Sequence, residues 1–298
     1  MVSALIVGLV KGSTLILNTI MKQPESRYNE MDFLAFLHFF TEYYKSLQNN
    51  FFTGKQMEKD QVFAGKKFKT EPFEFNQEVA RVFDDMLNRS VPFYQESIRR
   101  QSQLTAQFYQ PGTRIYDLGC SHGNLGMMIL KQLKEKPFKM VAVDSSKPMI
   151  EKYSKRLEKY GRSSQIDLVC GLLEDMQIKD ASVILINLTL QFLDKEKRDD
   201  LIKKIYQGMN SKGILVLSEK IVHESKTLND LQTQFYTEFK LENGYSKLEI
   251  SQKRDALEKI LVPDSIETHQ NRILNAGFAK FDIWLKWFNF ASMIAIKR

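Results

Sequence analysis

The seven residues from Asp117 to Gly123 combine an acid, two glycines and small side chains in an order that suits nucleoside binding. A strand-like run, Arg114-Ile-Tyr116, leads into them, and a helical pattern continues to about Leu133. Gly119 and Gly123 permit backbone angles and a close approach that a side chain would block. The helix that follows presents free N–H groups at its start. The segment therefore predicts a strand, a glycine-rich turn and a helix, which together form half of a nucleoside-binding site.

Two acids decide which nucleoside this half-site favours. Asp117 directly precedes the turn, where an acid suits a cationic tail, such as an amino-acid ammonium, better than a phosphate. Asp144 ends the next apolar run, Met140-Val-Ala-Val143, and is placed to accept from a ribose diol. Ser121 stands where dinucleotide-binding turns usually have a glycine. The pattern favours S-adenosylmethionine (SAM) over NAD; the alternative is a tight strand-to-helix connection in another α/β protein.

Strand and helix patterns alternate after this turn, which predicts a parallel sheet covered on both faces. Ligands bind beyond the carboxyl ends of such strands, where Gly119, Asp144 and Asn187 fall. Two apolar runs split by Asn289 predict a closing hairpin. We therefore expect an α/β fold, a class I methyltransferase (Rossmann-like) sheet of seven strands. The predicted strands are 114–118, 139–143, 166–170, 183–187, 214–218, 281–288 and 290–296.

Helical sequence outside the sheet-forming region is expected to close over the ligand. Residues 76–108 are predicted to form two cover helices, the first with an apolar stripe from Val79 to Leu87 and the second after Ser90-Val-Pro92. A helical insertion at about 222–263, which turns at Asn243-Gly244, precedes the C-terminal hairpin. This insertion is the predicted place for substrate recognition or a dimer contact.

The enzyme-like pattern begins at about residue 57, so residues 57–298 are predicted to form one methyltransferase-like domain. Residues 1–56 form an N-terminal extension of unknown role. Its uninterrupted apolar run, Ala4–Val10, is too short to span a bilayer and lacks the features of a signal peptide. We therefore expect a cytoplasmic protein without a membrane partner. Within the domain, Asp264-Ser-Ile-Glu267 has the spacing of a capping box and is expected to open a helix.

Composition argues against several other classes of protein. The chain has 298 residues but only two cysteines, Cys120 and Cys170, which argues against a disulfide scaffold or a zinc site. The net charge is +7, but Lys and Arg are mixed with acids, so no direct binding of nucleic acid is expected. The four histidines lack metal-ligand spacing and are expected to be mostly surface groups; no metal site is predicted. Cys120 is not expected to be a nucleophile, because no motif positions a histidine base beside it.

Five stretches resemble the carboxy-S-adenosyl-L-methionine synthase family, from about residue 57 to the end, and several of them lie outside the generic cofactor fold. They are Val82-Phe-Asp-Asp-Met-Leu-Asn-Arg-Ser-Val-Pro-Phe-Tyr94, Tyr116-Asp-Leu-Gly-Cys-Ser121, Asn187-Leu-Thr-Leu-Gln-Phe-Leu193, Leu217-Ser-Glu-Lys220, and Asn243-Gly-Tyr-Ser246 through Ser251-Gln-Lys-Arg254. The resemblance implies a homodimer that converts SAM and prephenate to carboxy-S-adenosyl-L-methionine and phenylpyruvate. It also implies that a separate enzyme uses the product to carboxymethylate a wobble uridine in tRNA.

The same resemblance implies which residues contact the cofactor. Asp144 binds the ribose, and Leu173 offers its backbone N–H to the adenine ring. Arg254 reaches the added carboxylate and in the family comes from the neighbouring subunit; a planar guanidinium pairs well with a carboxylate, which a plain methyl donor lacks. The predicted cofactor-binding residues are Tyr94, Gly119, Cys120, Ser121, Asp144, Ser145, Leu173, Asn187 and Arg254. No catalytic residue is predicted.

One position departs from the family's pattern. The family usually has an acid after the third strand that accepts from the adenine amino group, and this chain has Leu172 there. Glu174 or Asp175 could substitute after a small loop shift. A lost neutral hydrogen bond costs about 0.5–1.5 kcal/mol, so weaker cofactor binding is expected rather than none. For the prephenate pocket, Arg89 is a candidate.

The implied reaction asks little of protein bases. Prephenate loses carbon dioxide and hydroxide as its ring becomes aromatic. The hydroxide can take a proton from the sulfonium-bound methyl group, and the resulting ylide can trap the carbon dioxide. The protein's share would be proximity and the exclusion of water. Two alternatives stay open: an ordinary SAM-dependent methyltransferase that acts on a small molecule or tRNA, and a SAM-binding protein without catalysis.

Overall fold

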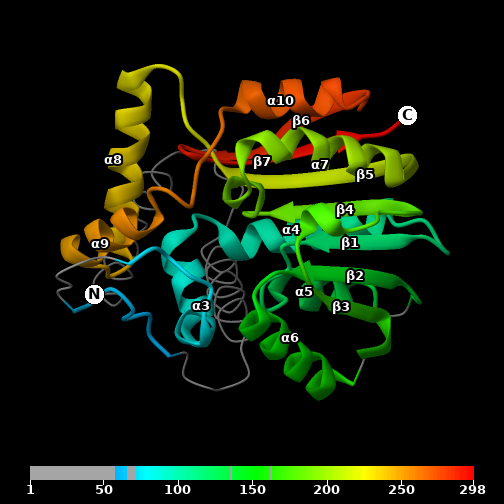
Figure 1. Cartoon of the computed structure of the whole chain (residues 1–298), viewed down its shortest axis with the longest axis horizontal. Coiled ribbons are helices and arrows are strands. Elements are labelled where there is room, and N and C mark those ends of the chain that lie inside the picture. The colour runs from blue at the N-terminus through cyan, green and yellow to red at the C-terminus, as the bar shows by residue number, and fades with distance from the viewer. Residues whose placement is uncertain (1–57, 66–70, 135, 162) are drawn as a thin grey trace, which may run out of the picture. The chain divides into compact units, whose positions relative to one another are not determined.

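The computed structural model describes residues 58–65, 71–134, 136–161 and 163–298, which lie within one unit, Met57–Arg298. They fold around a seven-stranded sheet ordered β3-β2-β1-β4-β5-β7-β6 (Figure 1). Strands β1 to β5 pair in parallel, and β7 is antiparallel to both β5 and β6. The strands are β1 (Arg114–Leu118), β2 (Lys139–Asp144), β3 (Ile166–Cys170), β4 (Ala181–Asn187), β5 (Met209–Lys220), β6 (Lys280–Trp287) and β7 (Phe290–Ile296).

The predicted α/β class I methyltransferase sheet, with its closing hairpin, is confirmed by this topology. Strands β4 and β5 begin two and five residues earlier than predicted, because Ala181 and Met209 pair ahead of a register shift, and β6 begins one residue earlier. The early part of β5 includes the exposed Ser211 and Lys212, so an apolar pattern could not find it. The predicted extension, residues 1–56, lies outside the described residues, and its role stays open.

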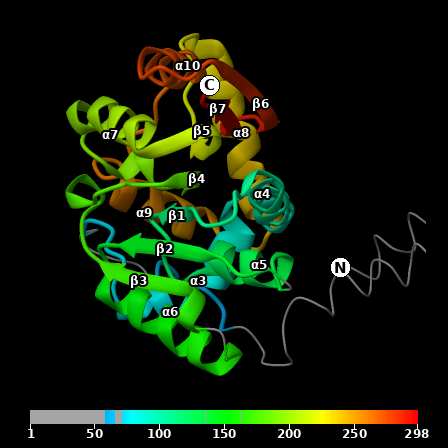
Figure 2. The ribbon, with the colours of Figure 1, turned by 90° about the vertical axis from the view of Figure 1, so that its right-hand side faces the viewer.

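Each face of the sheet has its own helices, because successive strand residues point to opposite faces. One core cluster joins the sheet to α7 (Lys195–Gly208) and α10 (Ile266–Asn275). The other joins it to α4 (Tyr94–Phe108), α5 (Asn124–Gln132) and α6 (Lys147–Tyr160). Figure 2 shows the strands between α7 and α10 on one side and α4 and α5 on the other. Within the described ranges, no helix is both long and apolar enough to cross a membrane.

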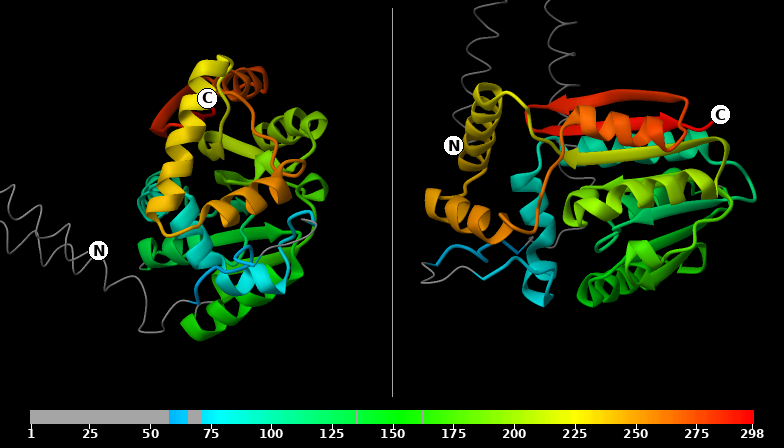
Figure 3. Two further views of the ribbon diagram at one scale, coloured as in Figure 1. Left: turned by 90° about the vertical axis from the view of Figure 1, so that its left-hand side faces the viewer. Right: turned by 45° about the horizontal axis from the view of Figure 1, so that its top comes forward.

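The strand order places a ligand crevice between β1 and β4. From β1 the chain moves outward to β2 and β3 and then returns to β4 on the other side of β1. Crevices for ligands form at such a reversal, beyond the carboxyl ends of the strands. Helices α3 (Gln77–Ser90), α8 (Lys226–Glu242) and α9 (Lys247–Leu257) gather beyond one end of the sheet (Figures 1 and 3).

The first cover helix, α3, packs as its apolar stripe predicts. Asn76 caps its first turn by accepting from the Val79 N–H. The buried Val82 and Met86 of this helix join a core cluster that includes Met149 of α6 and Ala256 of α9. The cover helix is therefore attached both to the sheet layer and to the insertion.

The insertion forms two helices, α8 and α9, and a complete capping box opens α9. Ser246 Oγ accepts from the Glu249 N–H at 3.2 Å, and Glu249 Oε2 accepts from the Ser246 N–H at 2.7 Å. At α10 the predicted capping box is wrong: Ser265, not Asp264, is the N-cap residue, and it accepts from the Thr268 N–H. The carboxylate of Asp264 instead binds two arginine side chains.

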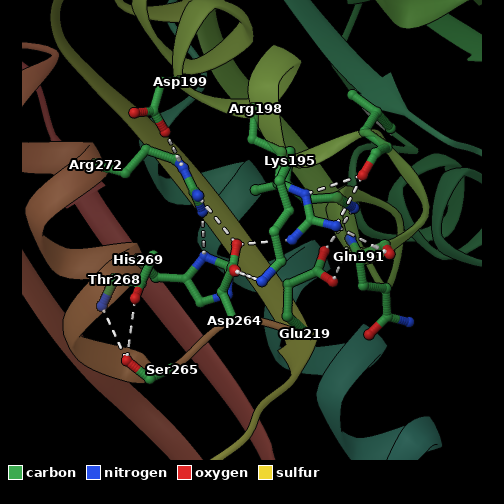
Figure 4. A network of polar contacts seen from close by, with 12 residues as sticks. Gln191, Lys195, Arg198, Asp199, Glu219, Asp264, Ser265, Thr268, His269 and Arg272 are labelled. Atoms are coloured by element: carbon green, nitrogen blue, oxygen red, sulfur yellow. Dashed lines mark hydrogen bonds and ion pairs between the residues drawn. The ribbon is translucent and has the colours of Figure 1, made fainter. Parts of the chain in front are cut away.

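Asp264 lies at the centre of a buried ionic cluster (Figure 4). Its Oδ2 accepts from Arg198 Nη1 at 2.7 Å and from Arg272 Nη2 at 3.0 Å. Burial alone would raise the pKa of Asp264, but the hydrogen bond from Arg198 and the two arginine charges lower it below its ordinary value. Burial and the charge of Arg272 lower the pKa of His269 to about 4, so the neutral ring can accept from Arg272 Nη1.

The same cluster fixes the loop at residues 188–193, which we call the β4 loop. The Arg198 guanidinium donates to the carbonyls of Gln191 and Leu193. From the other side, the Glu219 carboxylate accepts from the N–H groups of Thr189, Leu190 and Gln191 at 2.8–3.1 Å. The β4 loop therefore has its carbonyls bound by a guanidinium and its N–H groups bound by a buried carboxyl group, which holds it beside the glycine turn.

We expect Asp264→Ala to destabilise the fold strongly, because it leaves two buried guanidinium groups without their shared carboxylate. The free energy of unfolding should fall by about 3–5 kcal/mol, as measured by urea denaturation. A suitable control is Asp200→Ala, which removes a largely exposed carboxylate from the neighbouring helix and should change stability by less than about 0.5 kcal/mol. Equal losses in the two variants would contradict this account of the cluster.

Candidate active site

One cavity of about 500 Å³ lies beyond the carboxyl ends of β1, β2 and β4. Strand tips, the β4 loop, the cover helices and the insertion helices all contribute to its walls. Each of the nine predicted cofactor-binding residues lines it: Tyr94, Gly119, Cys120, Ser121, Asp144, Ser145, Leu173, Asn187 and Arg254. The structure thus brings the predicted set together, and the contact that each makes with a ligand stays a prediction.

The glycine turn needs its first glycine for two separate reasons. Gly119 has φ +85°, in the left-handed region that favours glycine. A Cβ added there would lie 2.1 Å from Thr189 Oγ1 in the β4 loop, so a side chain would push the two loops apart. Gly123 is similarly crowded, because a Cβ would lie 2.2 Å from the Tyr153 ring. The turn and the β4 loop therefore form one closely packed floor at the point between β1 and β4.

Asp144 is held rigidly at the tip of β2. One carboxylate oxygen accepts from the Ser121 N–H and the other from the Ser146 N–H, both at 2.8 Å. Each oxygen keeps a second lone pair, so a ribose diol can still bind to it. Burial raises the pKa of Asp144, and the two backbone hydrogen bonds oppose that rise.

Asp117 contributes a second and less satisfied carboxylate to the cavity. The residue is only 1% exposed, and its Oδ2 has no hydrogen-bond partner in the described part of the chain. Burial, together with the charge of Asp144, raises the pKa of Asp117 to about 7. A buried carboxylate of this kind gains most from a cationic ligand, because the ligand supplies the missing partner.

A hydrogen-bonded chain ties the cover helices to the glycine turn. Asp84 Oδ1, on α3, accepts from Asn124 Nδ2 at 2.8 Å and pairs with His122 Nε2 at 2.9 Å. Asn124 Nδ2 also donates to the Tyr94 hydroxyl at 3.2 Å. Burial opposes ionisation of Asp84, but its bonds and charge pairing with His122 hold its pKa well below the ordinary value.

The expectation that most histidines are surface groups is wrong for two of them. His122 and His269 are each only 1% exposed, and each lies in one of the polar networks described above. His223 is exposed, and His38 lies outside the described residues. Histidines adjacent to a glycine turn or in an amphipathic helix carry no local signal that says what will pack against them.

Both cysteines are free thiols. Cys120 is buried, its Sγ lies 3.6 Å from the Ser121 carbonyl oxygen, and burial raises the pKa of its thiol well above the ordinary value. These surroundings suit packing rather than nucleophilic attack, because the thiolate is the reactive form. In the described part of the chain, no three His, Cys, Asp or Glu residues are grouped as a metal site would require.

At the tip of β4, a residue that the sequence did not single out positions Asn187. Gln101, on the second cover helix, is fully buried, and its Nε2 donates to Asn187 Oδ1 at 3.0 Å and to Ser218 Oγ at 3.2 Å. It therefore links α4 to the tips of β4 and β5. A glutamine in the middle of a polar helical sequence gives no sign of such a role.

The segment after β3 contains the departure from the family's pattern. Leu172 is 53% exposed and lines the cavity, so its side chain offers no acceptor to an adenine amino group. Of the two possible substitutes, Glu174 lines the cavity and Asp175 does not. Glu174 Oε1 already accepts from Lys197 Nζ at 3.1 Å, although its side chain remains partly exposed.

The basic residues of the site lie on the insertion side. The side chain of Arg254, on α9, is 72% exposed, lies 3.3 Å from neighbouring Asp255 and donates to Ser251 Oγ at 3.4 Å. Lys220, Lys240 and Lys253 also line the cavity, and the sequence analysis did not identify them.

The prediction that Arg89 belongs to the substrate pocket is not supported, since Arg89 does not line the cavity. Its guanidinium stacks 3.8 Å from the centre of the Tyr245 ring and donates to the Asn243 carbonyl and to Asp85. These contacts join α3 to the turn between α8 and α9. Arg89 is thus a structural link between the cover and the insertion.

We expect Gly119→Ala to weaken both the fold and SAM binding. Gly161→Ala is a matched control, because Gly161 also has a positive φ but an added Cβ there meets no described atom within 4 Å. The left-handed backbone should cost each variant about 1–2 kcal/mol in urea denaturation. Only Gly119→Ala must also displace Thr189, so only it should lose affinity in a SAM titration. Equal SAM affinities in the two variants would contradict the proposed packing of turn against loop.

Comparison with known proteins also identifies a methyltransferase fold. Residues 115–213 match a family model described as a methyltransferase domain. A putative SAM-dependent methyltransferase from Methanococcus maripaludis superposes with a TM-score of 0.52 at 19% identity and covers 78% of this chain and 97% of its own. A putative O-methyltransferase from Nostoc punctiforme gives a TM-score of 0.54 at 14% identity, with 79% and 66% coverage. Likeness at these identities establishes the fold alone.

Sequence relatives are much closer. The carboxy-S-adenosyl-L-methionine synthase of Desulforapulum autotrophicum is 54% identical over 241 residues, which are 81% of this chain and 98% of the relative. The enzyme of the same name from Shewanella baltica is 45% identical over 238 residues, or 80% and 98%. Sequence identity at this level, over nearly the whole length of each relative, shows that this chain belongs to the carboxy-S-adenosyl-L-methionine synthase family.

Proposed function

We propose that this chain is a transferase that converts SAM and prephenate to carboxy-S-adenosyl-L-methionine and phenylpyruvate. The observation that carries the proposal is a single cavity with acids at the strand tips and basic groups on the insertion side. An unpaired buried acid suits the ammonium of SAM, and basic groups suit carboxylates. The names of the two bacterial relatives support the same product.

The acidic side of the cavity is proposed to orient SAM. Asp144 accepts from the ribose hydroxyls through its free lone pairs, and Asp117 pairs with the amino-acid ammonium. Gly119, Cys120 and Ser121 contribute the turn along which the ligand lies. The Leu173 N–H donates to the adenine ring, which sits beside the exposed Leu172 without a side-chain acceptor at that position.

The chemistry then needs two substrates held together and kept from water. As prephenate becomes phenylpyruvate, it releases carbon dioxide and hydroxide. The hydroxide takes one proton from the methyl group on the SAM sulfur and becomes water. The carbon of the resulting ylide attacks carbon dioxide, which forms the new C–C bond of the carboxymethyl group. The protein supplies proximity, and the cover helices and insertion exclude the water that would otherwise quench the ylide.

Arg254 is proposed to bind the new carboxylate, and to do so in the partner subunit of a homodimer. Its guanidinium is largely exposed, and its contacts with Asp255 and Ser251 are exposed too, so it can reach another molecule without breaking a buried contact. The product is proposed to serve wobble-uridine modification of tRNA by a separate cytoplasmic enzyme, with no direct contact between this chain and nucleic acid.

The activity is tested by incubating the protein with SAM and prephenate and recording the nucleoside by mass spectrometry. We expect a mass gain of one carboxyl group that requires both substrates. Arg254→Ala should lower kcat/KM by roughly 10- to 100-fold, the loss of a charge-assisted bond, whereas Lys247→Ala, an exposed change on the same helix, should not. Methylation of an added acceptor without prephenate would support the ordinary methyltransferase, and retained SAM without turnover would support a binding protein.

The shared site is tested with mixed dimers of Arg254→Ala and Asp117→Asn chains. If Arg254 acts in the partner's cavity, a mixed dimer contains one site with both residues intact, and activity returns on mixing. If Arg254 acts in its own cavity, neither site is intact and the mixture stays inactive. The second result would remove the cross-subunit role but would leave the proposed reaction standing.

SAM affinity should depend on pH through Asp117. The pKa of Asp117 is raised to about 7 in the free protein. Below that pH the Asp117 carboxyl group must lose its proton before it can pair with the ammonium. The dissociation constant should therefore rise about tenfold per unit as pH falls below 7, and level off above it. The free protein behaves oppositely: the stability that this group contributes is present at low pH and is lost as pH rises towards 7.

Asp117→Asn should remove this pH dependence and weaken SAM binding at pH 8 by roughly 10- to 100-fold. Asp167→Asn, which changes an exposed acid on β3, should retain the slope. Titration calorimetry across this pH range measures both. A slope that persists in Asp117→Asn would show that another group binds the ammonium.

A further inference from the structure

Three lysines converge on the cavity from elements far apart in the sequence. Lys220 ends β5, Lys240 lies in the last turn of α8, and Lys253 lies near the end of α9. All three line the cavity, and none has a part in the contacts proposed for SAM. Lys240 and Lys253 belong to the insertion helices, and Lys220 ends the strand that leads into the insertion.

Two of these lysines lack the partner that a buried ammonium ordinarily has. Lys240 is only 8% exposed, and its Nζ lies 4.2 Å from the centre of the Tyr236 ring. Lys220 Nζ lies 5.1 Å from the centre of the same ring. Among the described residues, neither ammonium has a hydrogen bond or an ion pair. Lys253 differs, because its Nζ donates to Ser90 Oγ at 3.1 Å and lies 3.7 Å from Asp60 Oδ2.

The cluster is electrostatically incomplete. Burial, with the charges of Lys220, Lys253 and Arg254, lowers the pKa of Lys240 to about 7. Burial also lowers the pKa of Lys220. Placing like charges together out of water is unfavourable unless an anion joins them, because a buried charge needs a partner of opposite sign. Because Lys220 and Lys240 have no anionic partner among the described residues, a ligand that binds beside them is expected to be anionic.

The wall between the two ammonium groups is aromatic. The face of Tyr236 lies beneath both, and its ring packs at 5.2 Å and a 64° angle against Phe290, which also lines the cavity. An apolar ring can pack against such an aromatic wall while its charged substituents reach the nearby ammonium groups. The combination suits a small cyclic acid with two carboxylates better than inorganic phosphate or a linear acid.

We propose that Lys220 and Lys240 form the subsite that binds the carboxylates of the second substrate, a small cyclic dicarboxylate, against Tyr236. The inference rests on the proposed function, in which that substrate is prephenate, and adds the residues that hold it. Lys253 lines the same cavity but is already bound to Ser90 and Asp60. Arg254 keeps its separate role at the carboxylate of the product.

The test uses Lys240→Met and Lys220→Met, which remove the charge and keep the aliphatic length, with Lys247→Met as the control on an exposed position. Prephenate is titrated into protein saturated with S-adenosylhomocysteine, which lacks the methyl group that reacts. We expect each cavity variant to bind prephenate roughly 10- to 100-fold more weakly, as loss of one charge-assisted bond requires. The affinity for S-adenosylhomocysteine should not change, and Lys247→Met should behave as the parent protein.

Thermal unfolding without ligand gives a second readout. Because Lys240 is buried and unpaired, Lys240→Met should raise the unfolding temperature, whereas a lysine needed by the fold would lower it on removal. A lower unfolding temperature in both cavity variants would assign these lysines to the fold and overturn the proposal. Unchanged prephenate affinity in both variants would also overturn it.

Failure of the subsite and failure of the proposed function give different results. If the parent protein forms carboxy-S-adenosyl-L-methionine but the variants bind prephenate normally, the function stands and the subsite is wrong. If prephenate binding depends on the lysines but no carboxylated product forms, the subsite stands and the reaction is wrong. If the parent protein does not bind prephenate at all, both are wrong.

Discussion

Burial of unpaired charge of both signs in one cavity is the constraint on which the other features of this site depend. Among the described residues, Asp117 has a carboxylate oxygen without a hydrogen-bond partner, and the Lys240 ammonium lies over the Tyr236 ring without a hydrogen bond or an ion pair. Each would be more stable in water, so the fold must hold both in place at a cost. A ligand cation beside Asp117 and a ligand carboxylate beside Lys240 would offset that cost of burial. The cavity is therefore better suited to charged ligands than to a neutral one.

The β4 loop makes this arrangement rigid. Glu219 binds its N–H groups and Arg198 binds its carbonyls, while the Asp264 carboxylate fixes Arg198 in turn. Asp264 also pairs with Ile221 in an isolated bridge, at the two points where the insertion leaves and rejoins the sheet. The helices that carry Lys240 and Arg254 are therefore tied to the same ionic cluster that positions the strand tips. A disturbance of that cluster would reach both sides of the cavity.

The cover is attached in a complementary way. Asp84 holds His122 and Asn124 next to the glycine turn, and Arg89 stacks on Tyr245 at the turn between α8 and α9. Helix α3 thus contacts both the SAM side and the insertion side through buried polar groups. Such groups are costly to separate, since each would lose its partner. These buried contacts therefore hold the cover helix against both the glycine turn and the insertion.

The sequence by itself determined the sheet, the hairpin, the glycine turn and Asp144, because strand alternation, positive φ and the residue at a strand tip are local properties. The nine cofactor residues that it predicted, through motifs that resemble a known family, all line one cavity, although Arg254 was expected to come from a neighbouring subunit. It misplaced Arg89, His122 and the cap of α10, and it missed Gln101, Lys220 and Lys240. The role of a charged or polar side chain depends on which distant elements surround it. That was decided only when β5, α8 and α9 met at one end of the sheet, where burial turned ordinary lysines into unpaired charges.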